Sequence, residues 1–385
     1  MPNFFKSKIR DLIFLILSII LRFFPKSKKK INGINLVIPL KHTGLNRVGE
    51  MILNSLDKQL TVRIYHIFKF NSIKNSLRLS RNKSFFFNTN IFIGNPDFLF
   101  SYILRKPQFL LSQYNNIALW FWELNKLPVS WLQAAKFFKE IWVQSDFILQ
   151  NLNKYNIPAK KIPFVINIRF SKKFNRSYFN IPTNKFCFIF TFDFLSFYHR
   201  KNPEAVISAF NLLSETQKNI YLVIKTTNGE LSPYFKNKLN NIILGNKNIL
   251  FIDKTYDNDT HYSLISLCDC YISLHRAEGL GLGLAEAMFL GLPVIATNYS
   301  GNLEFMKKEN SLLVDFNLIN LANSNYMHSS DQLWADPKIN HAVELMSKII
   351  KKKSLREKLI LNGQKYIKMN HNTSVLKNFL TKNLM

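Results

Sequence analysis

The second half of the chain alternates regularly between apolar runs and amphipathic stretches. Runs typical of strands buried on both faces cover residues 185–192, 219–226, 249–254, 270–274, 294–297 and 312–315. Helical spacing occurs between and after them, at 233–242, 262–267, 284–290, 341–350 and 355–369. A further helix begins at Pro203, with Asn202 as its expected N-cap. Strands that alternate with helices in this way predict a parallel, doubly wound sheet.

The first half repeats this pattern less regularly. Strand-like runs cover residues 34–40, 62–68, 90–94, 117–122 and 140–144, and helical spacing occurs at 45–56 and 131–138. A basic, irregular passage at 160–177 has the character of a linker. A length of 385 residues also favours two domains. We therefore predict an α/β chain with domains at 31–168 and 169–362 and a terminal segment at 363–385.

Residues 1–30 differ in character from the rest of the chain. Their apolar run at 12–21 is broken only by Ser18 and has basic residues on both sides. The run is about half of the ~20 residues that span a bilayer, and no small-residue cleavage site follows it. Positive charge on both sides of an apolar helix is typical of a segment in the membrane interface. We predict a short amphipathic or apolar membrane-interface helix, with a helix packed on the protein's own surface or a single membrane span as the alternatives.

The overall charge is strongly positive. The formal net charge is +28 and the sequence pI is about 9.9. Such a charge favours an anionic partner such as a membrane surface, although abundant Lys, Asn, Ile and Phe also fit drift in genome composition. The basic residues are scattered and no nucleic-acid-binding module occurs, so nucleic acid is not an expected partner.

The three cysteines, Cys187, Cys268 and Cys270, all lie in apolar, strand-like runs. An odd number of cysteines in buried strands predicts free thiols and a reducing compartment. No second pair of Cys or His completes a metal site around Cys268 and Cys270, so we expect both to be core residues.

The polar chemistry concentrates between two predicted strands, at 270–274 and 294–297. Glycines alternate at Gly279, Gly281 and Gly283, just before a predicted helix. Glycines let a ligand approach the backbone, and a helix N-terminus offers unpaired N–H donors and partial positive charge to a phosphate. Glu278 and Glu286 flank this loop with seven residues between them, and carboxylates accept hydrogen bonds from sugar hydroxyls. We expect Glu286 in the first helical turn, where both carboxylates reach one ligand.

This stretch resembles the donor-binding motif of retaining glycosyltransferases of family 4, which have the GT-B fold. The resemblance is carried by SLHRAEGLGLGLAEAM at 273–288, followed by PVIAT and SGN. It covers about residues 30–370 and is also specific at 114–147. It implies two Rossmann-like domains that face a cleft, the second of which binds a nucleotide sugar. It also implies that the last helix, within 363–385, returns to the first domain.

The resemblance implies that Lys201 holds the donor diphosphate. In the family an Arg and a Lys five positions apart grip this group; Lys201 matches the Lys, but Ser196 stands at the Arg position. Arg200 is the candidate substitute. A solvated lysine at a helix start is the alternative for Lys201.

The same resemblance assigns the carboxylates. Glu286 is expected to hold the ribose hydroxyls, and Glu278 the hydroxyls of the transferred sugar. The rest of the implied donor site comprises Gly279, Leu280, Gly281, Ser300, Gly301 and Asn302. The resemblance implies no metal and no cofactor, since the nucleotide sugar is a co-substrate.

The first domain carries weaker family phrases. After the predicted strand at 117–122, Glu123 is a candidate catalytic residue that contacts the transferred sugar or the acceptor. Its alternative is a charge satisfied at the domain edge. Trp120 and Trp122 are acceptor-side candidates for a sugar-stacking face, with core packing as the alternative. Gly44 and Leu45 form a glycine turn where the family often reads GLGE, but the charged pair that follows is in swapped order.

The resemblance therefore implies a retaining glycosyltransferase that moves a sugar from a nucleoside-diphosphate sugar to a hydroxyl group. The acceptor is expected to be a glycan or a lipid-linked molecule of a surface polysaccharide, and the protein to lie in the cytoplasm on the inner face of the cell membrane. The alternative is a catalytically inactive nucleotide-binding or membrane scaffold on the same fold. A dinucleotide-binding oxidoreductase does not fit, because the third glycine comes one residue too early for G-x-G-x-x-G.

Overall fold

The computed structural model describes residues 33–39, 44–57, 60–67, 87–97, 115–321, 326 and 331–384. The membrane-interface helix predicted for residues 1–30 lies outside these ranges. Within them, no helix combines the length and apolar character needed to cross a bilayer. The chain forms two compact units. Unit 1 comprises residues up to Trp122, Lys126–Val165 and the residues from Asn372 onward; unit 2 comprises Glu123–Asn125 and Ile166–His371.

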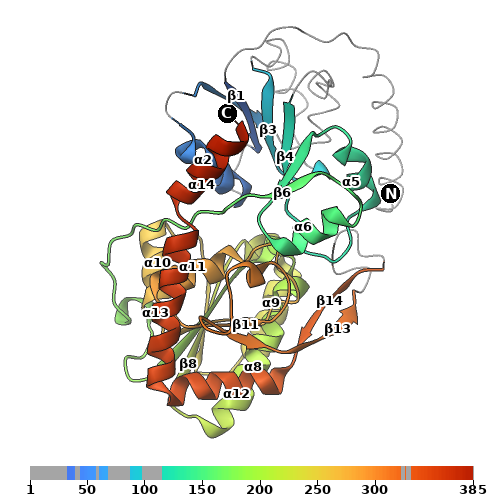
Figure 1. Cartoon of the computed structure of the whole chain (residues 1–385). Helices are drawn as coiled ribbons and strands as arrows, with labels where there is room; N and C mark the ends of the chain where they lie inside the picture. The colour runs from blue at the N-terminus through green and yellow to red at the C-terminus, as the bar shows by residue number, and fades with distance from the viewer. Residues whose placement is uncertain are drawn as a thin grey trace. The chain divides into compact units, whose positions relative to one another are not determined.

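The described strands of unit 1 form a parallel sheet in the order β2-β1-β3-β4-β5-β6 (Figure 1). The strands are β1 (Ile34–Pro39), β2 (Val62–Ile67), β3 (Thr89–Ile93), β4 (Asn115–Leu119), β5 (Glu140–Val143) and β6 (Ala159–Lys161). The helices are α2 (Gly44–Ser55), α5 (Val129–Ala135), α6 (Asp146–Asn153) and α14 (Thr373–Leu384). Leu376 and Leu380 of α14 pack into the same apolar core as Ile52 of α2. The end of the chain therefore belongs to the core of unit 1.

Unit 2 contains a second parallel sheet, in the order β12-β11-β10-β7-β8-β9. The strands are β7 (Phe186–Asp193), β8 (Ile220–Thr227), β9 (Ile249–Asp253), β10 (Cys270–Ser273), β11 (Val294–Thr297) and β12 (Leu312–Val314). The strand order reverses between β7 and β10, where an open α/β sheet opens a crevice at its carboxyl edge. The prediction of doubly wound parallel sheets is confirmed.

The two faces of the unit 2 sheet have different partners. Even-numbered residues of β7 and β8, such as Phe190 and Ile224, pack with α8 (Pro203–Thr216), α9 (Pro233–Ile243) and α12 (Ile339–Lys351). Helices α10 (Asn258–Ser266), α11 (Leu282–Leu290) and α13 (Lys353–Asn370) pack together on the other face (Figure 1). That face carries the polar side chains described below. The cysteines Cys187, Cys268 and Cys270 are buried free thiols, as predicted.

The remaining elements of unit 2 are short. They are η3 (Ser177–Phe179), η4 (Phe194–Ser196), α7 (Tyr198–Lys201), η5 (Gly229–Leu231), η6 (Gly301–Glu304) and the antiparallel hairpin β13 (Phe316–Asn320) and β14 (Leu333–Pro337). The hairpin is tied to the segment Glu123–Asn125, because the N–H of Leu333 donates to the Asn125 Oδ1 at 2.9 Å. This contact fits the assignment of Glu123–Asn125 to unit 2.

Two predicted local details are wrong. Helix α11 begins at Leu282 rather than Leu284, because Gly281 adopts a left-handed conformation (φ 85°) and is its N-cap. Glu286 therefore lies in the second turn of the helix, not the first. Asn202 precedes α8 as expected, but its side chain donates to the carbonyl of Leu274 at 2.9 Å and makes no capping hydrogen bond.

Candidate functional site

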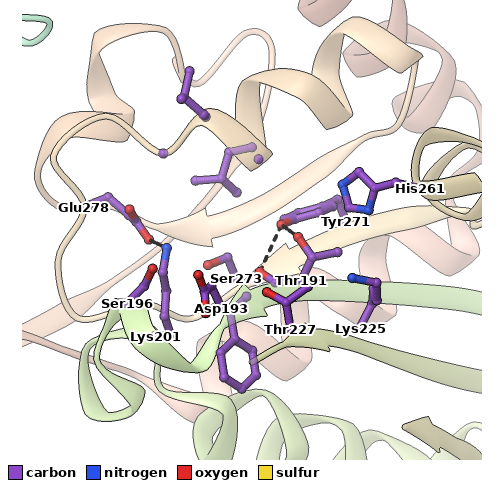
Figure 2. A pocket seen from close by; sticks show the side chains of 15 residues that line it. Thr191, Asp193, Ser196, Lys201, Lys225, Thr227, His261, Tyr271, Ser273 and Glu278 are labelled. Atoms are coloured by element: carbon purple, nitrogen blue, oxygen red, sulfur yellow. Dashed lines mark hydrogen bonds and ion pairs between the residues drawn. The ribbon is translucent and has the colours of Figure 1, made fainter. Parts of the chain in front are cut away.

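A cavity of about 280 Å³ opens at the carboxyl edge of the unit 2 sheet, at the ends of β7, β8 and β10 (Figure 2). All of its lining residues belong to unit 2. They are Thr191, Phe192, Asp193, Ser196, Lys201, Lys225, Thr227, His261, Tyr271, Ser273, Glu278, Gly281, Leu282, Gly283 and Leu284. The cavity thus lies where the strand order reverses. The end of the glycine loop (residues 279–283) and the start of α11 form one of its walls.

A compact ionic cluster of Arg200, Lys201 and Glu278 lies at one end of the cavity, where Lys201 and Glu278 line it and Arg200 does not. The Lys201 Nζ donates to Glu278 Oε1, and the Arg200 Nη1 lies 3.1 Å from Glu278 Oε2. Arg200 is 5% exposed and also donates to the carbonyl of Ala277 at 2.9 Å. Glu278 is 8% exposed. The two cations follow β7 and the carboxylate follows β10, so the adjacency of these strands brings them together across 77 positions of sequence.

Electrostatics keep this cluster charged. Burial by itself would raise the pKa of Glu278, but the adjacent charges of Lys201 and Arg200 outweigh it and lower that pKa to about 2. Glu278 and Glu123 together hold the pKa of the Arg200 guanidinium above its ordinary value, despite the opposing effect of burial. Burial lowers the pKa of the partly buried Lys201 ammonium, against the opposing charge of Glu278. At neutral pH the cluster therefore contains an ionised Glu278 paired with the buried Arg200 guanidinium, and Lys201 is the second partner of this carboxylate.

The turn at Ser300–Asn302 forms hydrogen bonds with the start of the glycine loop and fixes its position. The N–H of Glu278 donates to Ser300 Oγ at 2.8 Å, and the N–H of Gly301 donates to the carbonyl of Glu278 at 2.8 Å. A Cβ on Gly301 would lie 2.0 Å from the carbonyl oxygen of Gly279, so only glycine allows this approach. Asn302 is fully buried, where its side chain donates to the carbonyl of Thr297 at 3.0 Å. The SGN turn thus fixes the loop that leads into α11.

Helix α11 points its N-terminus at the cavity. Gly281, Leu282, Gly283 and Leu284 all line the cavity wall. The side chain of Leu280, by contrast, is 7% exposed and Leu280 is not a lining residue. The first N–H groups of a helix have no intrahelical partner and carry partial positive charge, so this wall suits an anion.

Glu286 lies behind this wall and not in it. It is 5% exposed, is absent from the cavity lining, and accepts a hydrogen bond from the Tyr262 hydroxyl at 3.1 Å. Tyr262 belongs to α10 and follows His261, which does line the cavity. The structure therefore brings Glu278 to the cavity directly, and places Glu286 one helical turn farther along, beside Tyr262.

Glu123 lies near the ionic cluster but does not line the cavity. Its Oε2 accepts a hydrogen bond from the Tyr326 hydroxyl at 2.5 Å, and its Oε1 lies 3.9 Å from Arg200 Nη2. Tyr326, 8% exposed, was not predicted from the sequence. Glu123 thus extends the row of alternating charges that begins with Lys201, Glu278 and Arg200.

The other candidates from the first half of the chain lie in unit 1. Trp120 and Trp122 are 0% and 1% exposed and pack on Trp131, with ring centroids 5.4 and 4.8 Å away. Core packing leaves neither ring a free face, so the expectation of a sugar-stacking face is wrong in this structure. Gly44 is exposed at the first position of α2, and Leu45 packs against the core of unit 1.

The structure also adds a residue that sequence reasoning missed. Lys225 lines the cavity from inside β8, and its side chain is almost completely buried. The signal was present in the sequence, because a lysine interrupts the apolar run of a strand that is buried on both faces. Among the described residues, no group of three or more His, Cys, Asp or Glu side chains is placed to hold a metal ion.

Comparison with known proteins agrees with this arrangement. Residues 172–366, about half of the chain, match the family model described as glycosyl transferases group 1. A glycosyltransferase from Rickettsia africae is similar in structure, with 15% identity and a TM-score of 0.68 over 93% of this chain and 98% of that one. HepE from Anabaena, in complex with UDP, has 13% identity and a TM-score of 0.68 over 92% and 99% of the two chains.

TarM from S. aureus, in a structure with UDP, is also similar, with a lower TM-score. It has 16% identity and a TM-score of 0.55 over 76% of this chain, which spans about half the length of TarM (54%). The family match covers the unit that holds the cavity, and both described sheets have the expected architecture. The protein therefore belongs to the group 1 glycosyltransferases and has the GT-B fold.

Proposed function

We propose that this enzyme is a retaining, metal-independent glycosyltransferase that moves a sugar from a nucleoside-diphosphate sugar to a hydroxyl group. The observation that carries the proposal is the pairing of Lys201 and Arg200 with Glu278 beside the N-terminus of α11. Lys201 and the N-terminus of α11 line the cavity, and Arg200 lies behind them in an ion pair with Glu278, an arrangement that suits a diphosphate. The UDP complexes of HepE and TarM support the same class of donor.

The proposed chemistry is dominated by charge. As the bond to the sugar breaks, the diphosphate gains negative charge and the anomeric carbon becomes cationic. Lys201 and the N–H groups at Gly281 and Gly283 are fixed in advance around the leaving group, and each good contact contributes about 2–4 kcal/mol to lowering the barrier. Retention of configuration follows from front-face attack by the acceptor hydroxyl, which uses no enzyme nucleophile.

The carboxylates have distinct proposed roles. Glu278 keeps the two cations in place and offers its remaining lone pairs to hydroxyls of the transferred sugar. Glu286 holds the ribose hydroxyls, with Tyr262 fixing its orientation. Glu123, held by Tyr326, supports Arg200 and contacts the transferred sugar or the acceptor.

Titration calorimetry with UDP and GDP tests the donor class. We expect the wild type to bind one of them with micromolar affinity, and Lys201→Ala to weaken this binding about 10- to 100-fold, because a charge-assisted contact is lost. Lys238→Ala is the matched control, since Lys238 forms an exposed ion pair with Glu204 (2.7 Å) and does not line the cavity. A folded wild type that binds neither nucleotide would instead favour an inactive scaffold.

We propose further that the acceptor is a glycan or a lipid-linked molecule of a surface polysaccharide, and that the enzyme acts in the cytoplasm on the inner face of the cell membrane. The charge of +28 and the apolar run at 12–21 between basic residues support attraction to an anionic membrane. The net charge and the apolar run say nothing about the donor cavity, so the membrane proposal needs a test that is independent of nucleotide binding.

Vesicle sedimentation tests the membrane proposal. The full chain is expected to bind vesicles of phosphatidylserine and phosphatidylcholine but not phosphatidylcholine alone, and binding should weaken as salt screens the charges. Removing residues 1–30 should reduce binding at least about 10-fold, because each basic residue near the surface contributes roughly 1 kcal/mol. Equal binding by the full and shortened chains would contradict a role for this segment.

A further inference from the structure

Lys225 is a buried cation at the far end of the cavity. It lies in β8 and pairs in register with Thr191 of β7, on the sheet face that carries Tyr271 and Ser273. It is 4% exposed. Figure 2 shows its side chain near His261, at the opposite end of the cavity from Lys201 and Glu278. The cavity therefore has a lysine at each end, and only one of these lysines is explained by the proposed diphosphate site.

The surroundings of Lys225 do not neutralise it. Its Nζ donates to the carbonyl of Thr226 at 3.1 Å and lies 5.4 Å from the centre of the Tyr256 ring. The two nearest carboxylates have other partners: Asp253 pairs with Lys236 at 2.7 Å, and Asp193 accepts from Asn228 at 2.8 Å. No carboxylate of the described residues forms an ion pair with Lys225.

A buried ammonium without a carboxylate partner destabilises the fold. Burial lowers the pKa of Lys225 to about 8, against the weaker opposing effects of Asp253 and Asp193. An apolar side chain of the same length would avoid this destabilisation. A buried lysine that lines a ligand cavity and has unused donors is therefore a candidate for ligand recognition.

The order of groups along the cavity tells which part of the ligand Lys225 meets. This step rests on the proposed function. If the diphosphate lies against Lys201 and the ribose lies against Glu286, the ribose is beside Tyr262, the residue that binds Glu286. His261 precedes Tyr262 and lines the cavity at the Lys225 end. The base, which extends from the ribose away from the diphosphate, then falls next to Lys225.

We propose that Lys225 reads the nucleobase of the donor by donating a hydrogen bond to a carbonyl oxygen of the base. An ammonium group has three donors and no acceptor. Uracil and guanine present a carbonyl oxygen at the position where cytosine and adenine present an amino group. Lys225 thus selects a keto base over the amino base of the same size.

Calorimetric titration of the full chain with UDP, CDP, GDP and ADP tests this directly. In one size class, UDP against CDP or GDP against ADP, the keto nucleotide should bind about 10- to 100-fold more tightly. Lys225 forms a charge-assisted hydrogen bond with the carbonyl oxygen of the keto base, whereas in the amino base it faces an amino group, which is also a donor. Lys225→Met keeps the length of the side chain but removes its donors, and should bring this ratio close to 1. Lys225→Gln supplies both a donor and an acceptor, so it can bind a keto or an amino base and should also bring the affinity ratio close to 1.

Lys254→Met is the matched control. The Lys254 Nζ also lies over the Tyr256 ring, at 5.7 Å, but this lysine is exposed and does not line the cavity. Its loss should leave the ratio unchanged. Lys225→Met should also unfold at the same or a higher temperature than the wild type, because a buried unpaired charge is removed, whereas a lysine with only a structural role would lower that temperature.

The outcomes separate the inference from the proposed function. A wild type that binds none of the four nucleotides overturns both. A wild type that binds one size class with equal affinity for keto and amino bases overturns the role of Lys225 alone, without any variant. Preference that survives in Lys225→Met and Lys225→Gln overturns it as well.

Discussion

Replacing Glu278 by glutamine is expected to lower the free energy of unfolding by about 3–5 kcal/mol at pH 7. The carboxylate accepts from Lys201 on one oxygen and pairs with Arg200 on the other. Glutamine has nearly the same shape, but leaves the buried Arg200 and the partly buried Lys201 without their shared counter-charge. Urea unfolding followed by fluorescence would measure the difference.

Glu357→Gln provides the matched control in the same unit. Glu357 pairs with Lys353 at 3.8 Å on the surface of α13, where both side chains are mostly exposed. Exposed pairs of this kind contribute about 0.3–0.5 kcal/mol, so this variant should unfold almost like the wild type. If Glu278→Gln were as mild as Glu357→Gln, the ionic cluster would not be a unit of stability.

The pH dependence of the same variant has a definite sign. The pKa of Glu278 is lowered from 4.5 to about 2 in the folded protein, so the unfolded chain takes up this proton first as the pH falls. The stabilisation from Glu278 is therefore complete above pH 4.5 and is lost as the pH falls towards 2. The difference in stability between wild type and Glu278→Gln should narrow over this window; a constant difference would contradict the ion-pair explanation.

The strands of unit 2 could be predicted because a strand buried on both faces reads as a continuous apolar run. The runs at 185–192 and 219–226 match β7 and β8 to within one residue. Helix starts were less predictable where glycine is the cap. Gly281 was interpreted as loop, but its left-handed conformation makes it the N-cap of α11, which shifts Glu286 into the second turn.

The ionic cluster could be predicted only as separate residues. Lys201 and Glu278 are 77 positions apart, and their meeting depends on β7 and β10 being neighbours in the sheet. Spacing along the chain does not contain that adjacency. The two tryptophans could not be assigned a role from the sequence. Trp120 and Trp122 were recognisable as a pair, but the pattern alone did not distinguish a sugar-binding face from buried packing on Trp131.

Lys225 was not predicted because it lies inside the apolar run at 219–226, whereas the predicted candidates lie at the ends of strands and in the motif at 278–286. A charged residue two positions before the end of β8 looked like the edge of an apolar run. Its importance depends on the face to which it points, and that face is set by register with Thr191. Polar interruptions of buried parallel strands are therefore worth treating as site candidates in their own right.

Replacing Gly301 by alanine is expected to cause the second large effect, a loss of about 3 kcal/mol in stability together with weaker nucleotide binding. The added Cβ would lie 2.0 Å from the carbonyl oxygen of Gly279 and 2.7 Å from that of Glu278. Both obstacles are backbone atoms, so no side-chain rotation relieves the clash. The turn must move away from the glycine loop and stretch the hydrogen bond from the Gly301 N–H to Glu278.

Gly44→Ala is the control that isolates the clash from the loss of a glycine. Gly44 begins α2, and a Cβ there would meet no described atom within 4 Å. Alanine should leave stability unchanged or raise it by up to about 1 kcal/mol, because it favours helix more than glycine does. Thermal unfolding and calorimetry with UDP and GDP would measure both variants. If Gly301→Ala kept wild-type stability and affinity while Gly44→Ala behaved as expected, the SGN turn would not be what holds the glycine loop, and the anion site would have to be organised by α11 and the Lys201–Glu278 pair alone.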